Sequence, residues 1–159
     1  MKTSSEKYDV QADPENTLDE ETLNDAIEDS SNNVNYKQFD LNGHGRISSQ
    51  ELDITFIIAG NEESFGGPAP NVWGHMLNLP SIRVQGKTLI NNYSEQGEVH
   101  GDHKATVGIF CHELGHTLGL PDLYDYDSIF QGVGNHSVMG GGSWGGYPLN
   151  GLKIINVSG

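Results

Sequence analysis

The sequence contains a single cysteine, Cys111, and few basic residues. One cysteine excludes an intramolecular disulfide framework and any zinc site that is built from several cysteines. Eight lysines and arginines stand against 22 acidic residues, so the formal net charge is -14. A protein of this charge repels phosphate groups, and we therefore expect no binding to nucleic acid.

Long apolar runs are also missing. No stretch approaches the ~18 uninterrupted apolar residues of a membrane-spanning helix, and Met1–Lys7 lacks the apolar core of a secretory signal. A chain of 159 residues has room for one domain, and we expect it to act as a monomer. Glycine, in contrast, is abundant with 21 residues, many of them in the C-terminal third, where we expect long loops.

The pattern of apolar and turn residues predicts a short series of elements. Residues 1–16 are polar and without a period, so we expect a tail there and a domain over residues 17–159. Thr17 and Glu20 match a capping box, which predicts a helix from there to about Asp29. The further predicted elements are a buried strand over Leu52–Ala59, two short strands over Ser81–Val84 and Thr88–Tyr93, a helix from about Lys104 to Leu118, and a glycine-rich segment over residues 140–146.

The predicted helix near residue 112 contains the sequence His-Glu-Leu-Gly-His over residues 112–116. On a helix, His116 lies about 40° and Glu113 about 100° from His112, so these side chains share one flank. Two imidazoles one turn apart can bind one Zn²⁺, which in a catalytic site also needs a third protein ligand and an open position for water. A separate apolar stripe, on which we expect the helix to pack, consists of Val107, Phe110, Cys111, Leu114 and Leu118.

The third ligand must be a residue other than glutamate, because none follows Glu113. The candidates downstream are Asp122, Asp125, Asp127 and His136. Residues 112–122 fit the pattern H-E-x-x-H-x-x-G-x-x-H with Asp122 in the last place, and Gly119 can adopt the left-handed conformation that ends a helix and turns the chain back. Asp122 is therefore the predicted third ligand, with Asp125 or His136 as the substitute. The histidines expected to be solvated or bonded locally are His75, His100 and His103.

These segments resemble the catalytic core of the immune inhibitor A type secreted metallopeptidases. The resemblance extends roughly over Val34–Gly146, and it is carried by residues 112–126, residues 133–145 with Met139 as a methionine turn, and upstream by residues 40–47, 58–60 and 71–75. It implies an α+β, metzincin-like zincin fold with a mixed twisted sheet, an active-site helix and a glycine-rich C-terminal loop region. It also implies one catalytic zinc, structural calcium, protein substrates and export from the cell. His136 stands where the family usually has tryptophan, and without a signal or pro-segment we expect a partial catalytic domain.

Residues 40–51 match the template of a calcium-binding EF-hand loop. The predicted calcium ligands are Asp40, Asn42, the Arg46 carbonyl, Ser48 through a water, and Glu51, with His44 at the fifth position. A histidine nitrogen is a poor ligand for a hard cation, so we expect weaker binding or a water in its place. A tight polar turn without calcium is the alternative interpretation.

The hypothesis that follows is a zinc-dependent endopeptidase acting on protein or peptide substrates. His112, His116 and Asp122 would hold the zinc, and Glu113 would take a proton from the bound water. An extended substrate would lie beside an edge strand, for which Thr88–Tyr93 is the candidate. The alternatives are a catalytically inactive calcium-binding module or truncated remnant, and a zinc amidase acting on small amides. The resemblance predicts an extracellular location.

Overall fold

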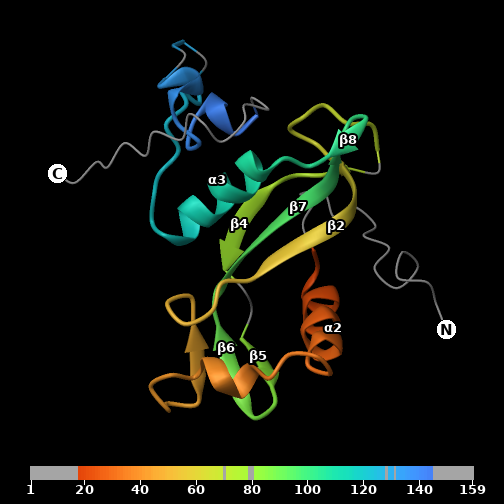
Figure 1. The fold of residues 1–159 in the computed structure, drawn as a ribbon, viewed down its shortest axis with the longest axis vertical. Coiled ribbons are helices and arrows are strands. Elements are labelled where there is room, and N and C mark those ends of the chain that lie inside the picture. The colour runs from red at the N-terminus through yellow and green to blue at the C-terminus, as the bar shows by residue number, and fades with distance from the viewer. Residues whose placement is uncertain (1–17, 70, 79–80, 128, 131, 145–159) are drawn as a thin grey trace.

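The structure is a computed structural model that describes residues 18–69, 71–78, 81–127, 129–130 and 132–144. The helices are α2 (Glu20–Ser30) and α3 (Val107–Thr117), with short 3-10 turns η1 (Tyr36–Phe39), η2 (Gly134–His136) and η3 (Gly141–Ser143). Figure 1 shows α2 beside the strands β5 and β6, and α3 alongside β4 and β7. No helix in the described ranges has the length and apolar character needed to cross a membrane. The predicted tail, Thr17 and most of the C-terminal segment lie outside the described residues.

The strands form two sheets, both of mixed direction. The smaller sheet has the order β1-β6-β5, formed by Arg46–Ser48, Lys87–Ile90 and Ile82–Val84. The larger sheet has the order β3-β2-β7-β4, formed by Asn71–Val72, Thr55–Glu62, Asn92–His100 and His75–Asn78, and β8 (His103–Lys104) pairs with β7. β2 runs parallel to β3 and β7, whereas β4 and β8 run antiparallel to β7. The expectation of an α+β fold with a mixed sheet is confirmed.

The helix α2 covers the smaller sheet with a thin apolar face. Its N-cap is Asp19, whose carboxylate accepts a hydrogen bond from Thr22 N at 2.7 Å, so the capping box predicted at Thr17 is wrong by two residues. Leu23 and Ile27 are buried and pack into one cluster. The other buried members of this cluster are Leu18, Tyr36, Ile47, Ile82, Val84, Leu89 and Tyr93. This core holds α2 on the sheet through burial of apolar area.

The strand predicted over Leu52–Ala59 is displaced and less buried than expected. β2 begins at Thr55 and ends at Glu62, and Ile57 on this strand is 59% exposed. Leu52 and Ile54, which precede β2, pack against the apolar cluster. Successive side chains on an extended chain point to opposite faces, so this apolar run has one face packed on the core and another exposed to solvent.

The hairpin predicted around Gln85 is confirmed, but its second strand is shorter than expected. β5 and β6 pair in antiparallel fashion, and Gln85 and Gly86 have φ values of 49° and 80°. β6 ends at Ile90, and the chain passes at the buried Asn91 into β7 of the other sheet. The predicted strand Thr88–Tyr93 is thus divided between two sheets. β6 lies between β1 and β5, so it is not an edge strand.

β7 carries a row of buried polar side chains. Ser94, Glu95, Gln96 and His100 are each at most 1% exposed. Glu95 accepts a hydrogen bond from Leu18 N at 3.2 Å, and His75 Nε2 lies 3.7 Å from its other oxygen. Burial raises the pKa of Glu95 to about 7 and lowers the pKa of His75, so desolvation outweighs their mutual attraction. His75 is buried, but its Nδ1 lies 2.6 Å from Trp73 O, so the expectation of a locally bonded side chain is confirmed for this residue. The expectation is wrong for His100, which is buried and has no hydrogen-bond partner among the described residues, whereas His103 is exposed and its Nδ1 lies 2.8 Å from Lys104 O.

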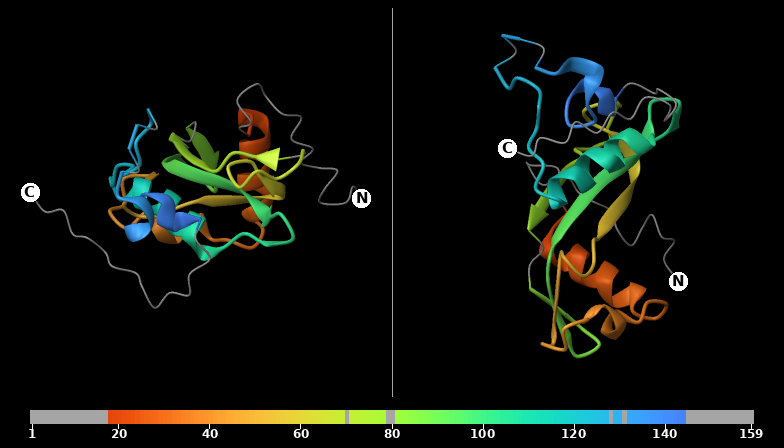
Figure 2. Two further views of the ribbon diagram at one scale, coloured as in Figure 1. Left: turned by 90° about the horizontal axis from the view of Figure 1, so that it is seen from above. Right: turned by 60° about the vertical axis from the view of Figure 1, so that its left-hand side comes forward.

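The helix α3 packs with its polar flank inward. Ile109, His112 and Glu113 are buried, whereas Val107, Leu114 and Leu118 of the predicted packing stripe are 50%, 42% and 74% exposed. The expectation that the apolar stripe forms the buried face is therefore wrong, and Cys111 on that stripe is only half-buried. The cause is tertiary, because α3 contacts β7 and β4, where the buried polar side chains gather. Figure 2 shows α3 lying along β7.

The pH dependence of stability tests the burial of Glu95. Between pH 4.5, the ordinary pKa of a glutamate side chain, and the folded-state pKa of about 7, the folded protein keeps a proton that the unfolded chain loses. The contribution of Glu95 to the free energy of unfolding therefore falls by about 3 kcal/mol as the pH rises through this window. Glu95→Gln removes this loss, so its stability relative to wild type in urea denaturation should increase from pH ~4 to pH ~8. A difference that does not change with pH would contradict the burial of this carboxyl group.

The close approach of η3 to α3 gives a second test. A Cβ atom added at Gly108 would meet the backbone carbonyl of Ser143, which cannot move aside as a flexible side chain could. Gly108→Ala should therefore lower the free energy of unfolding by about 1–3 kcal/mol. Val107→Ala, at a 50% exposed position of the same turn, is the control and should change stability by no more than about 0.5 kcal/mol. Equal stability of the two variants would show that η3 does not pack against the helix in this way.

Candidate metal centre

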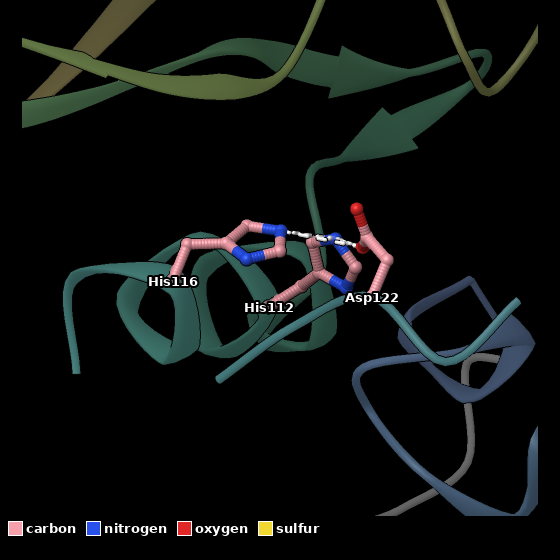
Figure 3. Close-up of side chains that lie close together, drawn as sticks. All are labelled: His112, His116 and Asp122. Carbon is pink, nitrogen blue, oxygen red and sulfur yellow. Dashed lines mark hydrogen bonds and ion pairs between the residues drawn. The ribbon is translucent and has the colours of Figure 1, made fainter. Parts of the chain in front are cut away.

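The structure brings His112, His116 and Asp122 together at one end of α3. The two Nε2 atoms lie 3.1 Å apart, and Asp122 Oδ1 lies 3.0 Å from His112 Nε2 and 3.3 Å from His116 Nε2. Figure 3 shows the two rings and the carboxylate pointing toward one another from the helix and from the segment that follows it. Among the described residues, this is the group of His, Cys, Asp and Glu side chains whose ligand atoms converge within 4.8 Å.

Backbone carbonyl groups orient both imidazoles. His112 Nδ1 lies 2.8 Å from Val138 O, and His116 Nδ1 lies 2.9 Å from Leu120 O. A carbonyl oxygen only accepts, so each Nδ1 carries a proton and donates it. In a neutral imidazole the Nε2 atom is then unprotonated and presents a lone pair. The backbone thus fixes the tautomer that a metal ion requires.

Asp122 Oδ1 and the two Nε2 atoms therefore face one another as potential ligands of one ion. Among the described residues, Asp122 Oδ1 is buried without a hydrogen-bond partner, although two Nε2 atoms lie close to it. A cation that lies among these atoms would compensate the buried carboxylate. Tetrahedral zinc with ligands at 2.0–2.1 Å places its ligand atoms about 3.3 Å apart, close to the observed separations of 3.0, 3.1 and 3.3 Å. The three residues fit a zinc ion.

The turn after α3 brings Asp122 to the histidines. Gly119 has a φ of 84°, its N–H donates to His116 O at 2.9 Å, and Leu120 N donates to Gly115 O at 2.9 Å. Leu123 N then donates to Met139 O at 2.7 Å, which fixes the segment carrying Asp122 against the loop that carries Val138. The predicted reversal at Gly119 is confirmed.

Tyr126 holds the second oxygen of Asp122, and the sequence analysis did not identify it. Its phenol donates a hydrogen bond to Asp122 Oδ2, which leaves Oδ1 directed at the two imidazoles. This bond to Asp122 raises the pKa of Tyr126, because it favours the protonated phenol. A tyrosine four residues after an aspartate in a loop has no periodicity that would have revealed this contact.

Glu113 lies next to the converging group without belonging to it. Its side chain is 3% exposed, and Oε2 has no hydrogen-bond partner among the described residues. Burial, followed by the charges of Asp122 and Glu62, raises the pKa of Glu113 to about 8. Glu62 is itself buried and accepts hydrogen bonds from Gly74 N and Gly97 N, at 2.9 and 3.1 Å. A carboxyl group in these surroundings can take up and release a proton near neutral pH.

Met139 lies beneath α3 at the position expected for the methionine turn. It is 3% exposed, and a Cβ atom added at Gly115 would lie 2.5 Å from its sulfur. Glycine at position 115 therefore allows the turn to approach the helix closely. Ser137 Oγ accepts a hydrogen bond from Met139 N at 3.1 Å and shapes the turn.

The other candidates for the third ligand lie outside the group. Asp125 accepts hydrogen bonds from the backbone N–H groups of Asp127, Ile129 and Phe130, and these bonds lower its pKa and commit its carboxylate to shaping the loop. Asp127 and His136 are exposed and are not members of the converging cluster. The structure therefore favours Asp122 over the substitutes.

The predicted calcium loop folds around its two carboxylates. Asp40 Oδ2 accepts from Gly45 N at 3.0 Å, and the hydrogen bond from Lys87 lowers the pKa of Asp40. Glu51 accepts from Leu41 N and from the backbone and hydroxyl of Ser48. The remaining predicted ligands differ in placement: Asn42 Oδ1 accepts from His44 N at 3.0 Å, and Arg46 and Ser48 lie in β1. Asp40 Oδ1 is buried without a partner, as an oxygen intended for a cation would be.

Metal analysis tests the assignment of the three ligands. Wild-type protein purified in the presence of zinc should contain about one zinc ion per chain by elemental analysis, since two imidazoles and a carboxylate make a three-residue site. His112→Ala should remove it, and Asp122→Asn should weaken its binding in a chelator competition. His136→Ala, which removes an exposed histidine outside the group, is the matched control and should keep the zinc. Equal zinc in wild type and His112→Ala would exclude the site.

Comparison with known proteins assigns the chain to a family. The immune inhibitor A peptidase M6 catalytic domain matches residues 3–159. Pre-pro-metalloprotease PrtV of two Vibrio cholerae serotype O1 strains is 32% identical over 127 residues, which are 69% of this chain and 14% of that protein. Immune inhibitor A of Bacillus thuringiensis subsp. alesti is 32% identical over 131 residues, 70% of this chain and 18% of that protein.

This chain therefore spans less than a fifth of the length of these relatives. No solved structure matches it significantly. The match to the catalytic-domain profile nevertheless covers nearly the whole chain, including the two histidines, Glu113 and Asp122. The chain belongs to the immune inhibitor A peptidase family, M6, through its catalytic domain.

Proposed function

We propose that this chain is a zinc-dependent endopeptidase domain that hydrolyses peptide bonds of protein substrates. The observation that carries the proposal is the convergence of the Nε2 atoms of His112 and His116 and Asp122 Oδ1 within 3.3 Å of one another. Zinc bound there supplies a Lewis acid that activates water and polarises a peptide carbonyl. Membership of a peptidase family supports this chemistry over other uses of a metal site.

Glu113 is the proposed general base and acid. It follows His112 directly, yet its side chain lies outside the group of ligand atoms, and its Oε2 has no hydrogen-bond partner among the described residues. From this position it takes the proton of the attacking water and delivers it to the amine that leaves. Its burial excludes bulk water, which would otherwise screen the charges that develop during the reaction.

The proposed substrate position lies along β4 rather than along the strand expected from sequence. β4 is the terminal strand of the larger sheet, antiparallel to β7, and it contacts α3. The edge of β4 away from β7 has no strand beside it in the described part of the chain. An extended peptide can add to such an edge through main-chain hydrogen bonds, which fix its position without requiring a particular sequence.

Family membership supports proposals on the domain, the location and the substrates of this activity. We propose that residues 17–159 form part of a metzincin-like catalytic domain, that the protein is exported, and that it acts as a monomer on proteins or peptides. We also propose that residues 40–51 bind calcium in addition to the zinc at α3. The buried, unpartnered Asp40 Oδ1 and the position of Glu51 support this second metal.

Removal of the Glu113 carboxylate tests the mechanism. Glu113→Gln keeps the shape of the side chain but cannot accept the proton, so hydrolysis of a fluorogenic peptide should fall by about 10²–10⁴-fold. Zinc content should remain unchanged, because Glu113 is not among the converging ligand atoms. Glu98→Gln, which removes the same charge from a half-buried position on β7, is the control for the change in net charge.

Three outcomes would contradict the proposal. Hydrolysis that survives in Glu113→Gln would remove this residue from the mechanism. Loss of zinc from the variant would make Glu113 a ligand instead of a base. Wild-type protein that holds zinc but cleaves neither proteins nor peptides would point to the inactive calcium-binding module, whereas cleavage of small amides alone would indicate an amidase.

A further inference from the structure

Asp40 in the 40–51 loop forms an ion pair with Lys87. Lys87 Nζ lies 2.5 Å from Asp40 Oδ2, and the Asp40 side chain is only 1% exposed. Gly45 N donates to the same oxygen at 3.0 Å, while Oδ1 is buried and has no partner. The carboxylate at the first position of this EF-type loop therefore already has an ammonium group on Oδ2, next to the Oδ1 atom that a calcium ion would bind.

Strand pairing in the smaller sheet places Lys87 next to the loop. β1, which forms part of the loop, runs parallel to β6 with Arg46 opposite Thr88, and Thr88 N donates to Gly45 O at 3.0 Å. Lys87 is the first residue of β6 and so lies beside the middle of the loop. The preceding Gln85 is tied to the other end of the core, since its amide donates to Ser31 O and Val34 O and accepts from Tyr36 N. The lysine thus projects from an anchored hairpin.

The side-chain oxygens of Glu51 and Asn42 already have donors from the chain. Glu51 Oε1 accepts from Leu41 N at 3.1 Å, and Oε2 accepts from Ser48 N and Oγ at 3.0 and 3.1 Å. Asn42 Oδ1 accepts from His44 N at 3.0 Å. The loop is therefore closed by hydrogen bonds and by one internal ion pair, and it needs no further charge to compensate Asp40.

We propose that Lys87 is the built-in cation of the 40–51 loop, which keeps the loop folded without calcium and must be displaced before calcium can bind. This inference rests on the proposed calcium loop and is independent of the zinc site. A calcium ion at Asp40 and an ammonium group on the same carboxylate would repel each other at short range. The lysine therefore weakens calcium binding and makes the stability of the fold independent of calcium.

Replacement of Lys87 tests this competition in the full chain. Lys87→Met removes the ammonium group, so calcium affinity measured by isothermal titration calorimetry should rise at least about tenfold over wild type. In a buffer that keeps the zinc site saturated, the melting temperature of wild type should be the same with and without added calcium, whereas that of Lys87→Met should be lower without calcium and recover when calcium is added. Asp40→Asn in the Lys87→Met background should abolish the gain in calcium affinity.

Arg83→Met is the matched control for net charge. Arg83 is an exposed residue of β5 that pairs with Thr88, so this variant removes one positive charge from the neighbouring strand without touching Asp40. It should bind calcium as weakly as wild type does. Lys87→Arg keeps the charge and should also keep calcium binding weak.

The possible results separate this inference from the other proposals. Equal calcium affinity of wild type and Lys87→Met, or an equal gain in Arg83→Met, would overturn the competition while leaving the calcium loop intact. Absence of calcium binding in every variant would overturn the calcium loop as well, but zinc content and peptide hydrolysis would still report on the site at α3. Failure of Lys87→Met to fold even with calcium would also overturn the inference, because calcium would then be unable to replace the lysine.

Discussion

The left-handed turn at Gly119 couples the end of α3 to the geometry of the candidate metal centre. Its φ of 84° reverses the chain, so that both the N–H and the carbonyl of Leu120 form hydrogen bonds at the site. The N–H of Leu120 caps the helix at Gly115, and its carbonyl accepts from His116 Nδ1. Asp122 follows two residues later and reaches both Nε2 atoms. One backbone conformation thus sets the tautomer of a histidine and the position of the carboxylate.

Polar groups are buried beneath α3, and this burial strengthens the electrostatic interactions around the candidate metal centre. The helix turns His112 and Glu113 toward β7, whose Glu95, Gln96 and His100 are fully buried, and leaves its apolar stripe at the surface. Charges in such surroundings interact more strongly than in water, and neutral forms of carboxyl groups are favoured. The raised pKa values of Glu95 and Glu113, about 7 and about 8, both express this desolvation.

The negative charges of Asp122 at α3 and of Asp40 in the 40–51 loop are balanced in different ways. At α3, the backbone carbonyls of Val138 and Leu120 accept hydrogen bonds from the two Nδ1 atoms, and both Nε2 atoms face Asp122 Oδ1. At the 40–51 loop, Lys87 supplies a positive charge and the backbone supplies the other donors. At the first site, no lysine or arginine among the described residues pairs with Asp122, so a bound cation would compensate its buried Oδ1. At the second site it must compete with an internal ion pair.

Local spacing in the sequence determined the helix around residues 112–116, the reversal at Gly119 and the choice of Asp122, because each depends on helical period or on the conformational freedom of one glycine. The break of the predicted strand at Asn91, the burial of His75 and His100, and the outward stripe of α3 depended on tertiary structure. The Leu18–Glu95 bond, 77 residues apart, and the Asp40–Lys87 pair, 47 apart, belong to the same class. Sequence periodicity records which side chains share a face, whereas burial and pairing depend on the distant segment that covers that face.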